Sequence, residues 1–114
     1  MAKVLIVDDD SDSRTLLSKL LGYYGYETRV ARDGESALTE AAEYDPDVVL
    51  LDIIMPGMDG FEVAQHLRED HHSAAMIVGM SGLPRADMLH RHRLFDYYLR
   101  KPVRIDQIRD LISR

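Results

Sequence analysis

The segment Val48-Val49-Leu50-Leu51, followed directly by Asp52, decides how this chain folds. An unbroken run of aliphatic, partly β-branched residues is typical of a strand buried on both faces, as in a parallel sheet. A second such run, Val4-Leu5-Ile6-Val7, also ends in acidic residues, Asp8-Asp9-Asp10. Ligands gather at the carboxyl edge of an open α/β sheet, and neighbouring strands would bring these carboxylates together there. Because like charges at close range repel, we expect a counter-charge at this edge, most simply a metal ion.

The composition indicates one ordinary globular domain. We expect residues 1–114 to form a single domain, because the chain is long enough for one core and too short for two. The absence of cysteine excludes disulfides and thiolate metal sites. No window approaches the about 18 apolar residues of a membrane span, and the N-terminus has no signal-peptide pattern. We therefore expect no membrane association and a cytoplasmic location.

The charge of the chain is acidic and unevenly spread. The net charge is −6; residues 1–74 hold 16 acidic and 6 basic side chains (−10), whereas residues 75–114 hold 4 and 8 (+4). An acidic domain is a poor direct partner for nucleic acid. We therefore predict no direct contact with nucleic acid, and interpret the two charge regions as solvated faces.

Strand-like and helix-like segments alternate along the chain. The predicted strands share short apolar runs, and they are 3–7, 27–31, 48–51, 76–80 and 97–99. The predicted helices begin at Ser11 as N-cap, at Asp33-Gly34, at Asp59, at Pro84 (a short helix over 85–93) and near Ile105. The first helix carries an apolar stripe of Leu16, Leu17, Leu20, Leu21 and Tyr24. Five βα units predict a doubly wound, flavodoxin-like (βα)5 sheet of order 2-1-3-4-5, in which the first and third strands are neighbours.

Chemically active side chains follow four of the predicted strands, namely Asp8 and Asp9, Asp52, Ser81 and Lys101. Each alone has an ordinary explanation, because Asp and Ser favour turns and a single Lys is usually solvated. Their convergence at one sheet edge is the stronger signal. By contrast, we interpret the five histidines as lacking a helical zinc-ligand spacing with an acidic partner, which argues against a zinc site.

The chain resembles the receiver domain of two-component response regulators over essentially its whole length. The resemblance rests on residues 4–10, on residues 45–60, on Met80-Ser81-Gly82 and on residues 98–102. It implies a signalling domain of a phosphorelay, which promotes its own phosphorylation and dephosphorylation and is not an enzyme acting on a separate substrate.

The resemblance also implies a role for each residue of the acidic site. Asp52 would accept a phosphoryl group from a phosphohistidine on a sensor histidine kinase or a histidine phosphotransfer protein. Mg²⁺, with Mn²⁺ as a substitute, would be bound by Asp9, Asp52 and the backbone carbonyl of Ile54, with Asp8 acting through water. Lys101 would pair with Asp52 and then with the phosphoryl oxygens.

Further residues would transmit the signal. Ser81 would donate a hydrogen bond to the phosphoryl group, and Tyr98 would be the aromatic side chain that moves inward with it. Ser13, Leu16 and Pro102 are predicted to dock the partner. The resemblance also implies a cis Lys101–Pro102 bond and a phosphorylation-dependent dimer through 85–93, 97–99 and 105–112.

Three competing functions fit the sequence less well. A haloacid-dehalogenase-type phosphatase would need an acid two residues after Asp52, where Ile54 stands. A flavodoxin would need a hydroxyl- and glycine-rich phosphate loop, where residues 8–10 are acidic. A degenerate receiver acting as an unphosphorylated interaction module usually lacks the acidic pair, the acceptor or the lysine, and all of these are present here.

Overall fold

The computed structural model describes residues 2–82 and 94–113. Its five strands are parallel and form one sheet in the order β2-β1-β3-β4-β5. The strands are β1 (Lys3–Val7), β2 (Glu27–Ala31), β3 (Val48–Asp52), β4 (Met76–Ser81) and β5 (Tyr97–Arg100). The predicted flavodoxin-like order, with β1 beside β3, is therefore confirmed.

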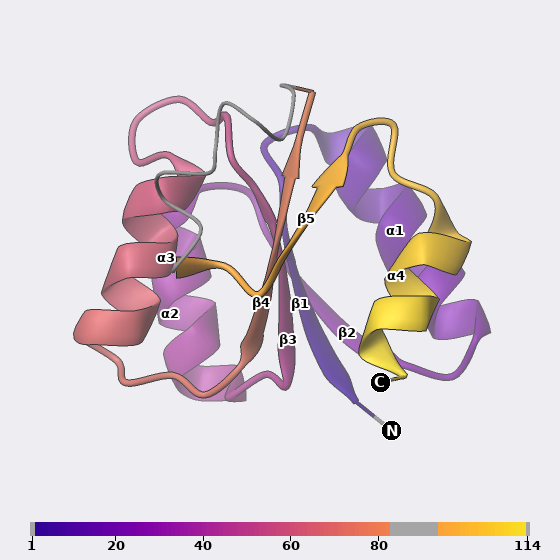
Figure 1. The fold of residues 1–114 in the computed structure, drawn as a ribbon, viewed down its shortest axis with the longest axis horizontal. Helices are drawn as coiled ribbons and strands as arrows, with labels where there is room; N and C mark the ends of the chain where they lie inside the picture. The colour runs from indigo at the N-terminus through magenta and orange to yellow at the C-terminus, as the bar shows by residue number, and fades with distance from the viewer. Residues whose placement is uncertain (1, 83–93, 114) are drawn as a thin grey trace.

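The described helices cover the two faces of the sheet. They are α1 (Ser11–Tyr23), α2 (Gly34–Tyr44), α3 (Gly60–Glu69) and α4 (Ile105–Ile112). α1 and α4 lie on one face, and α2 and α3 on the other (Figure 1). The helix predicted over 85–93 lies outside the described residues. No helix within the described ranges is long and apolar enough to cross a membrane.

The central strand β3 is buried at all five positions, as its unbroken apolar sequence predicts. Alternate side chains of β3 enter two separate cores. Val49 and Leu51 pack with residues of α2 and α3, whereas Val48 and Leu50 pack with residues of α1 and α4. Burial of this kind contributes roughly 25 cal/mol per Å² of apolar surface, so the two cores dominate the stability of the fold.

The start of α1 differs from the sequence prediction. Asp10, not Ser11, is the N-cap: its backbone is extended, and its carboxylate accepts a hydrogen bond from the amide of Asp12 at 3.3 Å and from the hydroxyl of Ser13 at 2.8 Å. Either residue type can cap a helix, and the helix begins one residue earlier than expected because the carboxylate reaches both groups. Asp59 caps α3 as predicted, by accepting from the amide of Glu62 at 2.9 Å.

Gly60 allows α3 to begin directly beside the end of β3. A Cβ atom at this position would lie 2.6 Å from the carbonyl oxygen of Asp52 and 2.6 Å from the Cα of Ile53. The amide of Gly60 donates to the carbonyl of Ile53 at 2.8 Å. The close approach fixes the backbone that follows Asp52.

We therefore predict that Gly60→Ala lowers the free energy of unfolding by about 1–3 kcal/mol or more, since backbone atoms would have to move. Urea denaturation measures the change. Gly22→Ala is the matched control, because Gly22 lies in α1 with nothing within 4 Å of the added methyl group. That control should stabilise the protein by about 0.5–1 kcal/mol. Equal midpoints for Gly60→Ala and wild type would contradict the close-packing account.

Candidate functional site

The ends of β1 and β3 bring three carboxylates together. The two strands pair in parallel with Val7 opposite Leu51, so that Asp8 and Asp52 follow at the same edge. One carboxylate oxygen from each of Asp8, Asp9 and Asp52 lies within 4.8 Å of the others. Asp8 is 1% and Asp52 3% exposed, whereas Asp9 is open to solvent. The cluster is therefore buried on one side and accessible on the other.

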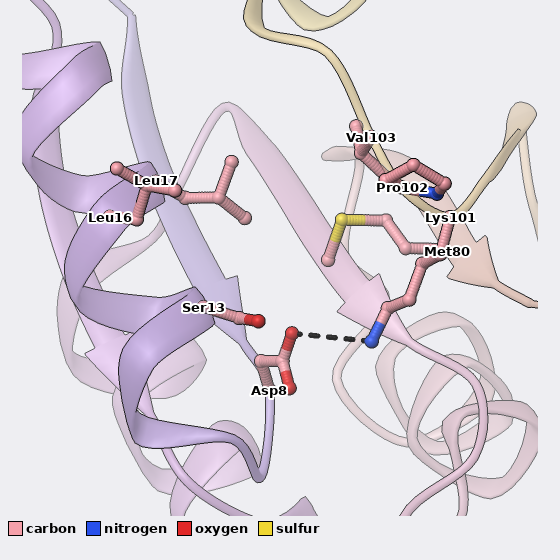
Figure 2. Close-up of a pocket in the computed structure, with 8 residues that line it drawn as sticks. All are labelled: Asp8, Ser13, Leu16, Leu17, Met80, Lys101, Pro102 and Val103. Atoms are coloured by element: carbon pink, nitrogen blue, oxygen red, sulfur yellow. Dashed lines mark hydrogen bonds and ion pairs between the residues drawn. The ribbon is translucent and has the colours of Figure 1, made fainter.

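Lys101 supplies a positive charge to this cluster. Its Nζ lies 3.3 Å from Oδ1 of Asp52. The same Nζ lies 3.5 Å from Oδ2 of Asp8, the contact drawn in Figure 2. The lysine follows β5, and its amide donates to the carbonyl of Ser81 at 2.8 Å, which extends the pairing of β5 with β4. The Lys101–Pro102 bond is cis, as predicted.

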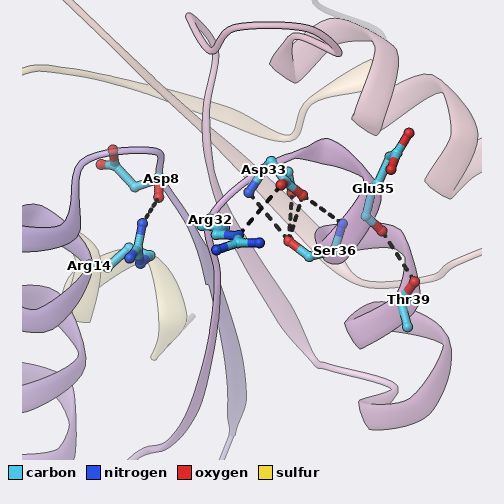
Figure 3. A network of polar contacts seen from close by, with 7 residues as sticks. All are labelled: Asp8, Arg14, Arg32, Asp33, Glu35, Ser36 and Thr39. Carbon is cyan, nitrogen blue, oxygen red and sulfur yellow. Dashed lines mark hydrogen bonds and ion pairs between the residues drawn. The ribbon is translucent and has the colours of Figure 1, made fainter.

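Backbone and side-chain hydrogen bonds hold the Asp8 loop in place. The amide of Asp10 donates to Oδ1 of Asp8 at 2.9 Å. Arg14 Nη1 donates to the carbonyl oxygen of Asp8 at 2.9 Å, from the second turn of α1 (Figure 3). The amide of Asp8 donates to the carbonyl of Ala31 at 3.1 Å. Sequence reasoning missed Arg14, because only the folded helix brings its guanidinium back over the end of β1.

The pKa of Asp52 is raised to about 7: burial is the largest cause, the charge of Lys101 opposes the rise, and the neighbouring carboxylate of Asp8 adds to it. Burial lowers the pKa of Lys101, but Asp52 and Asp8 outweigh that effect, so the net pKa of Lys101 is raised. One ammonium group thus faces two buried carboxylates and an exposed third. The site has an excess of negative charge that a cation would relieve.

Ser81 and Tyr98 lie on neighbouring strands close to this edge. Ser81 is the last residue of β4 and is 4% exposed. Tyr98 is half-buried in β5, opposite Gly79. Its ring packs with the α2 and α3 core, beside Phe95. The side chain of Ile54, two residues after Asp52, is 60% exposed.

The three predicted docking residues line one hollow of about 490 Å³. Figure 2 shows Ser13 and Leu16 on one side and Pro102 on the other, and the Asp8–Lys101 ion pair also lines the hollow. The other lining residues are Leu17, Met80 and Val103. Leu16 is 58% exposed, so it faces this hollow rather than the core that its place in the apolar stripe predicted. The predicted dimer face includes residues 85–93, which lie outside the described residues.

The interpretation of the histidines was wrong in one respect. Asp70, the C-cap of α3, is four residues after His66, and Nδ1 of His66 contacts Oδ2 of Asp70. Nevertheless, within residues 2–82 and 94–113 the one cluster of three potential metal ligands is Asp8, Asp9 and Asp52. The His66–Asp70 pair is an i,i+4 contact on the helix surface.

The fold and the acidic edge match a known family. The response regulator receiver domain matches residues 4–113, so this chain belongs to the family of response regulator receiver domains. Receiver domains are signalling domains that histidine kinases or phosphotransfer proteins phosphorylate. The cluster of Asp8, Asp9 and Asp52 fits the phosphoacceptor site of this family.

Two curated relatives illustrate the similarity. Sporulation initiation phosphotransferase F of Bacillus subtilis is 34% identical over 114 residues, covering 98% of this chain and 91% of that protein. Response regulator PleD of Caulobacter vibrioides is 43% identical over 86 residues, covering 71% of this chain. The chain spans only 19% of PleD, and 24% of Regulatory protein AtoC of Escherichia coli.

Solved structures show the same architecture. Chemotaxis protein CheY4 of Vibrio cholerae matches with a TM-score of 0.92 and 30% identity, covering 100% of this chain and 98% of that one. Response regulator TrrA of Thermotoga maritima, solved in complex with Mg(2+)-BeF, matches with a TM-score of 0.88 and 32% identity, covering 99% and 97%.

The raised pKa of Asp52 predicts a pH-dependent stability without metal. The folded-state pKa of about 7 lies above the ordinary value of 3.8, so between these values the native state binds more protons than the unfolded state. The free energy of unfolding therefore falls as the pH rises through this window. Asp52→Asn should remove this pH-dependent loss. Relative to wild type, its free energy of unfolding should be higher by on the order of 1–4 kcal/mol above pH 7 and almost unchanged near pH 4.

Urea denaturation in EDTA at several pH values measures this difference. Asp12→Asn is the control, because it removes a solvent-exposed carboxylate from the first turn of α1. For each variant, the difference in free energy of unfolding from wild type is plotted against pH. If this difference depends on pH no more for Asp52→Asn than for Asp12→Asn, the electrostatic account of Asp52 is wrong.

Proposed function

We propose that this receiver domain is phosphorylated on Asp52 by a phosphohistidine-bearing partner, and that Ser81 and Tyr98 convert the modification into a surface change. The observation that carries the proposal is the placement of Asp52. Its carboxylate is buried at the end of the central strand, 3.3 Å from Lys101 Nζ and within 4.8 Å of Asp8 and Asp9.

A carboxylate can act as a nucleophile in phosphoryl transfer. A carboxylate oxygen of Asp52 forms a bond to phosphorus while the bond between phosphorus and the imidazole nitrogen of the donor breaks, and that nitrogen keeps the electron pair. Positioning and charge stabilisation supply most of the catalysis in such transfers. The ion pair of Lys101 with Asp52 supports a role for this lysine, which would pair with the phosphoryl oxygens after the transfer.

The residues present fit a magnesium ion. Three carboxylates with oxygens within 4.8 Å form the hard, oxygen-rich donor set that Mg²⁺ prefers, and Mn²⁺ accepts the same donors. Asp9 and Asp52 would hold the ion with the backbone carbonyl of Ile54, and Asp8 would assist through water. When bound, the ion supplies positive charge that stabilises the transferring phosphoryl group.

The positions of Ser81 and Tyr98 support their proposed role as switch residues. Ser81 ends β4, and the amide of Lys101 donates to its carbonyl at 2.8 Å, so the hydroxyl-bearing residue and the lysine share a fixed strand pair. A phosphoryl group adds charge and strong acceptor oxygens. A hydrogen bond from Ser81 to that group would draw the end of β4 toward Asp52 and alter the packing around Tyr98 in β5.

The hollow beside Lys101 suits the docking of the phosphodonor. Its lining includes the apolar side chains of Leu16 and Pro102 together with Asp8 and Lys101 of the acidic site. A donor helix seated there would bring its histidine to the acidic edge. An unphosphorylated interaction module is not favoured, because the acidic pair, the acceptor and the lysine are present and adjacent.

Acetyl phosphate with Mg²⁺ should phosphorylate the isolated chain on Asp52. Intact-mass analysis should show one added phosphoryl group on the wild-type protein and none on Asp52→Asn. Asp47→Asn is the matched control, since Asp47 lies at the opposite end of β3 and accepts from the amide of Lys3. Equal labelling of Asp52→Asn and wild type would show that Asp52 is not the phosphoryl acceptor.

Mg²⁺ should stabilise the fold, because it relieves repulsion among the three carboxylates. A ligand that binds only the native state adds about 2.7 kcal/mol at a hundredfold excess over its Kd. Thermal melting in Mg²⁺ and in EDTA measures the difference. The shift should shrink in Asp9→Asn and persist in Asp70→Asn, which removes an exposed carboxylate at the C-cap of α3. An unchanged shift in Asp9→Asn would argue against metal binding at this cluster.

Leu16→Glu should separate docking from chemistry. We expect phosphotransfer from a histidine kinase or phosphotransfer protein that phosphorylates the wild type to fall about tenfold or more, which corresponds to about 1.4 kcal/mol of binding. Labelling by acetyl phosphate should not change. Val30→Glu is the control, since Val30 is also an exposed apolar residue (43%) but lies in the edge strand β2. Undiminished transfer to Leu16→Glu would rule out this surface.

A further inference from the structure

Gly79 leaves a space in the middle of β4 that two aromatic rings share. A Cβ atom at position 79 would lie 3.0 Å from each of three side-chain atoms: Cδ1 of Ile53, Cδ1 of Phe95 and Cδ1 of Tyr98. A glycine inside a strand weakens it, and often marks a close approach by other groups. Here the approaching groups are the side chains that a residue with a Cβ would displace.

The two rings are in direct contact with each other. The ring centroids of Phe95 and Tyr98 are 5.0 Å apart with an interplanar angle of 37°. On its other side, Phe95 meets Phe61 of α3 edge-to-face, at 5.6 Å and 87°. Both distances lie in the favourable range for aromatic pairs. Phe95 is only 6% exposed, so its ring is enclosed between α3 and β5.

The residue after Phe95 fixes its backbone. The amide of Asp96 donates to the carbonyl of Ile77 at 2.8 Å, and Oδ2 of Asp96 accepts from the amide of Ile77 and from Arg68 Nη2, each at 2.8 Å. Arg68 also donates to the carbonyl of Ala75 at 2.7 Å. These bonds tie the segment before β5 to the start of β4 and to α3. The backbone that carries the Phe95 ring is therefore held by contacts that do not involve Tyr98.

We propose that Phe95 is a positioning residue for Tyr98: its anchored ring holds Tyr98 in the observed orientation, in the space that Gly79 leaves open. Turning Tyr98 breaks the contact with Phe95, so this contact sets how readily Tyr98 responds to events at Asp52. The inference rests on the proposed function, in which Tyr98 is the switch aromatic.

The test is the χ1 rotamer population of Tyr98, measured through its three-bond N–Cγ and C′–Cγ couplings by NMR on the full chain. These couplings report the rotamer itself and are insensitive to the loss of a neighbouring ring. We expect the wild type to show the two coupling values of a single Tyr98 rotamer. In Phe95→Leu we expect both couplings to take values averaged over several rotamers. Phe61→Leu is the matched control, because Phe61 touches Phe95 from the opposite side.

Gly79→Ala probes the same contact from β4, and it decides the question if Phe95→Leu does not fold. Its methyl group meets both rings at 3.0 Å, so we expect it also to shift the Tyr98 couplings. Unchanged couplings in folded Phe95→Leu would overturn the inference. Equal averaging in Phe61→Leu would also overturn it, since Tyr98 would then respond to general loosening of the core.

Acetyl phosphate labelling of the wild type is measured in parallel. If the wild type is labelled normally and the Tyr98 couplings are unchanged in Phe95→Leu, this inference is wrong and the proposed function stands. If the wild type is not labelled but the Tyr98 couplings are averaged in Phe95→Leu, the proposed function is wrong and the positioning of Tyr98 by Phe95 stands.

Discussion

The repulsion among buried carboxylates at the carboxyl edge of the sheet is the constraint on which the rest of the structure depends. Asp8 and Asp52 are almost fully buried, and Lys101 alone among the described residues forms ion pairs with them. Two carboxylates facing one ammonium group in a poorly solvated site are unfavourable by themselves. The fold must therefore stabilise the site from outside it.

That stabilisation comes from the two cores on either side of β3. A strand buried at every position is locked in register, because a shift of one residue would exchange the side chains of the two faces. The register places Asp52 beside Asp8 and opposite Met80, while the backbone bond from Lys101 to Ser81 brings the lysine to the same edge. A strained charge arrangement held by a rigid apolar frame is suited to respond when charge is added or neutralised.

The sequence predicts the frame well because its signals are local. The apolar runs of β1 and β3 and the acids that follow them lie next to one another along the chain, so the sheet order and the carboxylate cluster can be inferred together. Lys101 is far from the acidic residues in sequence, so its position beside them could be predicted only from the order of the strands. The N-cap of α1 shifted from Ser11 to Asp10 because two adjacent residues could each cap the helix, and the choice depends on which side chain reaches the free amides.

Contacts between distant residues were beyond sequence reasoning. The packing of Phe95 on Gly79 and Tyr98 depends on how two strands and a helix meet, and no periodicity reports it. Leu16 illustrates a different limit: it belongs to the same predicted apolar stripe as the core residues Leu17 and Leu21, yet it faces the hollow beside Lys101. An apolar stripe shows which side of a helix is hydrophobic, and it does not show where the core ends and a docking surface begins.

The most direct test of the account is the titration of the Asp52 carboxyl carbon by NMR, in EDTA and in saturating Mg²⁺. Burial and the neighbouring carboxylate predict a pKa of about 7 without metal, against the ordinary 3.8. Mg²⁺ at the cluster should lower that pKa, because the cation favours the charged carboxylate. A carboxyl carbon that titrates near its ordinary pKa in EDTA, and is unaffected by Mg²⁺, would contradict the claim that buried, unbalanced negative charge organises this site.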